Sequence, residues 1–140
     1  MFKDIEITGV DKAGVTQPKN DGTRGSGLYK VPFKLSERPP TGWDEFFVNA
    51  WDHPESWTTQ HRPRIARVIG DTIVLDGTTM DEVEKVHQGT LDGAVARANR
   101  EYRAYDEKRA AQAKADEDRA TEHKREVDEV ADRLKFGKKE

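Results

Sequence analysis

Residues 65–75 read IARVIGDTIVL, and this stretch does most to decide the fold. Its β-branched residues fall in two short runs separated by Gly70 and Asp71. Such a pattern predicts two strands joined by a tight turn, in which glycine supplies the positive φ. Because a hairpin alone cannot bury its apolar face, the rest of the chain must supply more strands and a cover.

More strand signal lies upstream of this hairpin. In residues 29–35, YKVPFKL, large apolar residues occupy every second position, which is the pattern of a strand. Proline cannot donate a ladder hydrogen bond, so Pro32 predicts that this strand lies at an edge of the sheet. Ile5 and Ile7 predict a shorter, half-buried strand, and the glycine-rich residues 9–27 predict a long loop between the two.

Two segments have helical spacing of apolar residues. Residues 43–51, WDEFFVNAW, carry aromatic side chains three and four positions apart. Thr41 is the expected N-cap of this helix, and Pro54 predicts its end near residues 52–53. We expect Asp76 and Gly77 to turn the chain into a second helix, which Thr79 and Glu82 begin as a capping box.

In the second helix, apolar residues recur every three or four positions from Met80 to Tyr105, with His87 on the apolar face as a satisfied core histidine. Gly89 and Gly93 lie four residues apart, where we expect another backbone to come close. The element order is therefore β-β-α-β-β-α. It predicts an α+β fold in which a small antiparallel sheet is packed by helices on one face.

The composition divides the chain into two parts. Hydrophobic residues make up 34% of the 140 residues and charged residues 36%, so the whole chain cannot form one well-filled core. Residues 106–126 contain no large apolar side chain. We therefore expect a compact domain over residues 1–105 and a charged helical extension over residues 106–140. The extension is a solvated, partly disordered helix or a weak coiled coil, because only alternate seam positions such as Val127 and Leu134 are apolar.

Several kinds of site are excluded or not predicted. The chain has no cysteine, which excludes disulfides, thiol catalysis and zinc ribbons. No two of its four histidines lie at metal-ligand spacing, and the glycines of residues 22–27 lead into a strand rather than a helix, so we predict neither a metal nor a cofactor. The net charge is −3, and we see no signal peptide and no membrane-spanning run. A soluble, cytoplasmic protein that does not bind membranes is the expectation.

The leading functional hypothesis is a non-catalytic interaction module or accessory subunit. It docks on a larger protein, or on a second copy of the chain, through an apolar tip of the C-terminal helix, formed by Val127, Val130, Leu134 and Phe136. The aromatic helix offers a second contact surface through Trp43, Phe47 and Trp51, unless these side chains form the core.

Two alternatives remain open. The first is a nucleic-acid-associated adaptor, in which Trp57 stacks on a base while Arg62, Arg64 and Arg67 contact phosphates. In an extended segment Arg62 and Arg64 share one face and Arg67 points to the other, and Arg62 and Arg64 could equally pair with Glu55 or with acids of the second helix. The second alternative is an enzyme whose site is assembled from distant residues around His53 and His61.

Overall fold

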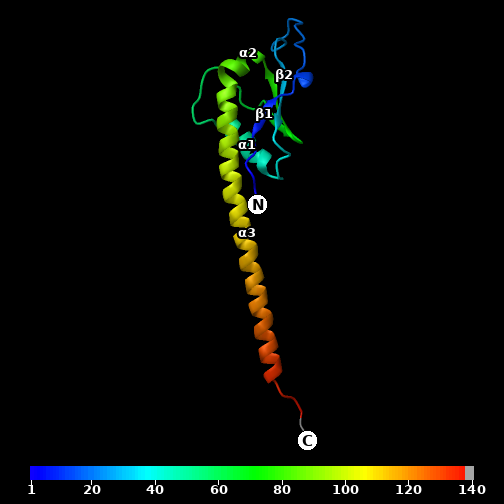
Figure 1. Ribbon diagram of the computed structural model, residues 1–140, viewed down its shortest axis with the longest axis vertical. Helices are drawn as coiled ribbons and strands as arrows, with labels where there is room; N and C mark the ends of the chain where they lie inside the picture. Colours follow the sequence, from blue (N-terminus) through cyan, green and yellow to red (C-terminus); the bar gives the residue numbers. More distant parts are fainter. Residues whose placement is uncertain (138–140) are drawn as a thin grey trace. The chain divides into compact units, whose positions relative to one another are not determined.

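The structure is a computed structural model that describes residues 1–137. Its elements follow the predicted order and form a four-stranded antiparallel sheet with one face covered by helices (Figure 1). Contacts group Met1–Arg103 into one compact unit, and a second unit begins at Ala104. The elements are β1 (Ile7–Val10), the 3-10 turn η1 (Lys12–Gly14), β2 (Tyr29–Leu35), α1 (Trp43–Asp52), β3 (Ala66–Ile69), β4 (Thr72–Thr78), α2 (Met80–Glu82), the π-helical turn η2 (Val83–His87) and α3 (Gln88–Arg133).

The sheet has the strand order β1-β2-β4-β3. The β3–β4 hairpin is the predicted one, since Ile69 pairs with Thr72 across a two-residue turn whose first residue, Gly70, has a φ of 61°. β2 has the predicted bounds, but the prediction of an edge position is wrong, because β2 pairs with both β1 and β4.

Pro32 is tolerated in this central strand because its nitrogen faces a side where no donor is needed. Asp11 N–H donates to Pro32 O at 3.0 Å, and in an antiparallel strand the nitrogen and the carbonyl of one residue point to the same neighbour. On that side β1 has already ended at Val10. η1 covers the proline ring so closely that a Cβ on Gly14 would lie 2.8 Å from Pro32 Cγ.

Two predicted helix starts need correction. Asp76 and Gly77 do not form a turn, because β4 continues to Thr78 and Gly77, with a φ of 121°, is the extra residue of a bulge opposite β2. The N-cap of α1 lies one residue after the expected Thr41: it is Gly42, with a φ of 98°, and no side chain caps the helix. The predicted end of α1 is confirmed, since its C-cap is His53.

α2 begins with half of the expected capping box. Thr79 Oγ1 accepts from Glu82 N–H at 3.1 Å, but the Glu82 carboxylate bonds elsewhere, as described below. In η2 the Gln88 N–H donates to Val83 O, five residues back, and both Val83 and His87 are buried. The predicted apolar face of the second helix is confirmed where Leu91, Ala98 and Tyr102 are buried, but its two ends, Met80 and Tyr105, are 40% and 45% exposed.

Asn99 on α3 fixes the N-terminal segment to the core. Its side-chain amide accepts from Ile5 N–H (3.1 Å), donates to Ile5 O (2.9 Å) and also accepts from Trp43 Nε1 (2.9 Å). The amide thus bonds both the N–H and the carbonyl of Ile5, as a neighbouring strand would. Together with Trp43 Nε1, these are three buried polar groups that would otherwise have no hydrogen-bond partner.

Candidate functional site

The expected apolar tip is exposed. α3 runs through Val127 and Val130 to Arg133, and Leu134 N–H still donates to Val130 O at 3.2 Å. The exposed fractions are 50% for Val127, 40% for Val130, 54% for Leu134 and 89% for Phe136. Phe136 lies beyond the helix, so the helical face consists of Val127, Val130 and Leu134.

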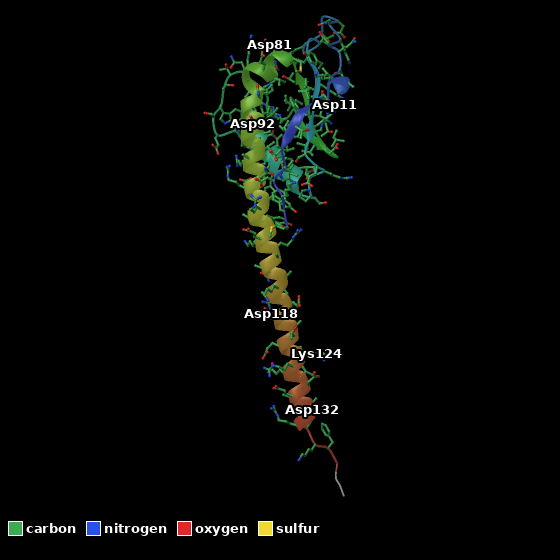
Figure 2. The ribbon with its side chains drawn as sticks, in the orientation of Figure 1. Asp11, Asp81, Asp92, Asp118, Lys124 and Asp132 are labelled. Atoms are coloured by element: carbon green, nitrogen blue, oxygen red, sulfur yellow. The ribbon has the colours of Figure 1, made fainter. Side chains whose placement is uncertain are left out.

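Local ion pairs accompany α3 beyond the compact unit. Figure 2 labels Asp118, Lys124 and Asp132 along this helix. Among residues 104–137 the structure contains six ion pairs between residues three or four apart; one of them joins Lys124 to Asp128 at 3.2 Å. Oppositely charged side chains at this spacing stabilise a helix modestly. This part of α3 therefore has local support without any buried residue of its own.

The proposal of an exposed aromatic face on α1 is wrong. Trp43, Phe47 and Trp51 have exposed fractions of 0%. Their polar atoms are also used inside the unit, since Trp51 Nε1 donates to Arg62 O at 2.8 Å. These side chains form the core, and a partner could reach them only if the unit opened.

The structure does not gather the proposed nucleic-acid residues into one free cationic patch. Trp57 is 59% exposed, but Arg62 is held by Glu82 and Arg67 by Asp76, with 2.6 Å between Arg67 Nη2 and Asp76 Oδ2. Arg64 has a φ of 69°, so the segment is not extended there, and the assumed sharing of a face with Arg62 is not met. For Arg62 the alternative of pairing with an acid of the second helix is confirmed.

Glu82 is the centre of a polar cluster that the capping-box pattern did not predict. Its carboxylate accepts from Arg62 Nε and Nη2, both at 2.7 Å, and from Thr78 Oγ1 at 2.8 Å. The hydrogen bonds from Arg62 hold the pKa of Glu82 down to about 2. The cluster ties β4, the start of the second helix and the loop before β3 together.

His87 lies beside this carboxylate, and His61 lies beside His87, with the two ring centroids 6.3 Å apart. His87 is fully buried, and neither ring nitrogen has a hydrogen-bond partner, although Nε2 is 3.5 Å from Glu82 Oε1. The expectation of a satisfied core histidine is therefore half right: it is a core residue, but its nitrogens are not satisfied. Burial lowers the pKa of His87, and the Glu82 charge opposes that shift. His61 packs against Trp51, with ring centroids 4.7 Å apart, and its Nε2 lies 2.9 Å from Trp51 O.

The structure does not pair His53 with His61. His53 Nδ1 lies 3.0 Å from Asn49 O at the end of α1, while the ring contacts of His61 are with Trp51, Trp57 and His87. Within residues 1–137 no group of three or more His, Asp or Glu residues is arranged to hold a metal ion.

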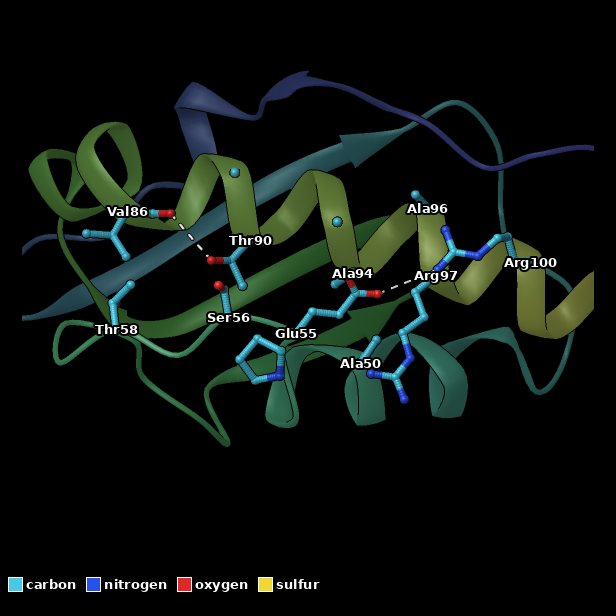
Figure 3. Close-up of a pocket in the computed structure, with 13 residues that line it drawn as sticks. Ala50, Glu55, Ser56, Thr58, Val86, Thr90, Ala94, Ala96, Arg97 and Arg100 are labelled. Carbon is cyan, nitrogen blue, oxygen red and sulfur yellow. Dashed lines mark hydrogen bonds and ion pairs between the residues drawn. The ribbon is translucent and has the colours of Figure 1, made fainter.

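Gly89 and Gly93 line an open groove rather than a close backbone contact. A Cβ built on either glycine meets no atom within 4 Å, so the expected approach of another backbone within the unit is wrong. The groove has a volume of about 390 Å³, and it lies between α3, the end of α1 and residues 54–58 (Figure 3). Both arginine side chains that line the groove have partners within the protein. Arg97 donates to His53 O at 3.0 Å, and the Arg100 guanidinium lies 3.9 Å from the Glu55 carboxylate.

Comparison with known proteins gives no relative from which to transfer a function. No family model matches the chain, and neither a curated protein nor a solved structure matches it. In the part of the chain that the structure describes, no helix has the length and apolar character needed to cross a membrane. The functional argument therefore depends on the geometry of this chain alone.

Proposed function

We propose that this protein is a non-catalytic interaction module that docks on another protein, a second copy of the chain included, through its C-terminal apolar tip. The tip is the set Val127, Val130, Leu134 and Phe136. The observation that carries the proposal is its exposure, which ranges from 40% to 89% in a segment whose other side chains are almost all charged or small. As part of the same proposal, we place the protein in the cytoplasm.

The spacing of the tip suits a helical partner. Val127, Val130 and Leu134 are three and four residues apart, which is the spacing of one coiled-coil seam. Earlier seam positions hold Ala113, Asp116, Ala120 and His123, so the seam is apolar only at its end. A short seam of this kind supports weak association by itself and gains affinity when the partner supplies a longer apolar groove.

The test replaces the tip without removing the helix. In the tip variant all four residues become glutamine, which is a good helix former. The matched control carries four glutamines on the same helix at Ala104, Ala110, Ala111 and Ala115, which lie outside the seam. Circular dichroism would check that the helix content is equal in the two variants.

Tagged wild type and both variants are then used for affinity capture from nuclease-treated host lysate, and the purified proteins are compared by sedimentation equilibrium. We expect a stoichiometric partner, or a self-associated species, with wild type and the control but not with the tip variant. Equal binding by the tip variant and the control would show that the tip is not the docking element.

A further inference from the structure

The outer edge of β1 has no neighbouring strand. β1 is at one end of the order β1-β2-β4-β3, and nothing else in residues 1–137 pairs with its outer side as a strand. Asp11 N–H points to β2, where it bonds Pro32 O, so the preceding amide of Val10 points outward. β1 also lacks the charged residues and prolines that usually blunt a free edge, whereas the opposite edge strand, β3, carries Arg67.

An apolar groove lies directly beside this edge. All four residues of β1 line it, together with Phe33 of β2 and the apolar side chains Met80, Val83 and Leu91 of the second helical segment. Its volume is about 420 Å³, within the range of ligand sites in proteins. We call this the β1 groove. A free strand edge next to a helix is the arrangement in which a domain takes up an extended peptide as an added strand.

The rim of the β1 groove carries two carboxylates that are not used inside the protein. Glu84, Gln88 and Asp92 line it at successive four-residue steps, so they form one stripe along the helix. Glu84 and Asp92 are exposed, and within the described residues neither has an ion-pair partner. Residues eight apart on an α-helix are separated by about 12 Å, and the π-helical turn that contains Glu84 makes this an upper value for Glu84 and Asp92.

That separation is close to the distance between residues four apart on an extended chain. Side chains on one face of a strand recur every second residue, and residues four apart are separated by about 13 Å. On an extended segment that runs alongside the helix, two basic side chains four residues apart would therefore be spaced like the two carboxylates, with the side chain midway between them on the same face.

We propose that the β1 groove binds an extended segment of a partner protein with the pattern basic–x–apolar–x–basic, which pairs with β1 as a fifth strand. Backbone hydrogen bonds to Val10 and the adjacent residues of β1 supply affinity. The carboxylates of Glu84 and Asp92 select lysine or arginine at the two basic positions. The apolar lining of the groove selects the central apolar residue. This surface is separate from the C-terminal tip, so the proposal holds or fails independently of the proposed function.

The probe is a synthetic heptapeptide, TKTVTKT, blocked at both ends and fluorescently labelled, and its acidic counterpart is TETVTET. Binding is measured by anisotropy on the full chain, and amide exchange at Val10 is measured by NMR. We expect TKTVTKT to bind, to slow exchange at Val10, and to bind about tenfold more tightly than TETVTET, because two exposed ion pairs contribute about 1.4 kcal/mol.

The protein variant Glu84→Lys/Asp92→Lys tests the rim, and Glu107→Lys/Glu117→Lys is its control, with the same charge change on the same helix. All four positions are exposed, so both variants should fold. We expect loss of TKTVTKT binding in the first variant only. The proposal is overturned if TKTVTKT does not bind, if Val10 exchange is unchanged, or if the control loses as much affinity as the rim variant.

Discussion

Replacing Glu82 with glutamine should remove the strongest polar contact in the compact unit while keeping its shape. The carboxylate accepts two hydrogen bonds from Arg62 at 2.7 Å and one from Thr78 at 2.8 Å. Glutamine has nearly the same volume, but it is neutral and can turn only one oxygen toward the guanidinium. The Thr79 cap on the Glu82 backbone N–H remains. The variant therefore isolates the charge.

The expected loss follows from the pKa. The pKa of Glu82 falls from its ordinary 4.5 to about 2, and a shift of one unit corresponds to about 1.4 kcal/mol, so the charged form contributes about 3 kcal/mol at pH 7. The side chain is 24% exposed, and solvent screening makes this figure an upper bound. Glu82→Gln should lower the free energy of unfolding by about 2–3 kcal/mol at pH 7.

The pH dependence has a definite sign. A carboxyl whose folded pKa is lowered contributes its full stability above the unfolded value of 4.5 and loses it as the pH falls toward 2. About 2 kcal/mol of the Glu82 contribution is therefore lost between pH 7 and pH 3. The difference in stability between wild type and Glu82→Gln should shrink by that amount.

The assay is urea denaturation followed by tryptophan fluorescence at pH 7 and pH 3. Glu84→Gln is the matched control, because it makes the same chemical change two residues away at an exposed acid without an ion pair. The reasoning is refuted if Glu82→Gln destabilises no more than the control. It is also refuted if the difference from wild type is the same at both pH values.

Three further predictions concern packing and burial. Asn99→Leu leaves the Ile5 backbone and Trp43 Nε1 without partners, and we expect a loss of about 3 kcal/mol or more in the same urea assay. Gly89→Ala and Gly93→Ala should each stabilise the protein by about 1 kcal/mol, because a Cβ meets nothing there and alanine favours the helix; a lower Tm in either variant would contradict the open groove. Burial lowers the pKa of His87 below 6.5, so wild type should lose stability as the pH falls below 6.5, and His87→Leu should lose less over that range.

The strand of residues 29–35 and the hairpin turn at Gly70 followed from local chemistry, so the sequence predicted them, whereas the turn expected at Asp76 and Gly77 is part of β4. Alternation over residues 29–35 and glycine at position 70 are properties of the segment itself, and the structure has the strand and the hairpin there. The position of a strand within the sheet, at an edge or in the centre, depends on residues far away in the sequence. Pro32 suits a central strand only because β1 ends opposite it, and no pattern around Pro32 contains that information.

The polar contacts that organise the core were only partly predictable for the same reason, since pairing of Arg62 with an acid of the second helix was one expected alternative, but no pattern singled out Glu82 or the contacts of Asn99. Asn99 bonds Ile5, which is 94 residues earlier in the chain, and Glu82 bonds Arg62, 20 residues earlier. The breadth of the aromatic stripe on α1 also has a non-local cause. α1 packs on β3 and also meets α3, where Trp43 bonds Asn99 and Phe46 contacts Tyr102 edge-on, so it buries a wider face than a helix on a sheet alone.

The C-terminal tip differs from both groups, because nothing in the described chain explains its residues. Beyond Tyr102, α3 has no buried side chain, and its support comes from ion pairs between neighbouring turns. Valine is a poorer helix former than alanine, lysine or glutamate by about half a kcal/mol, so Val127 and Val130 weaken this helix slightly. Leu134 and Phe136 expose apolar surface that has a cost in water and no compensating contact. These side chains destabilise the isolated helix, and all of them lie in one short segment. Burial by a partner would explain both facts, and the glutamine variants test that explanation directly.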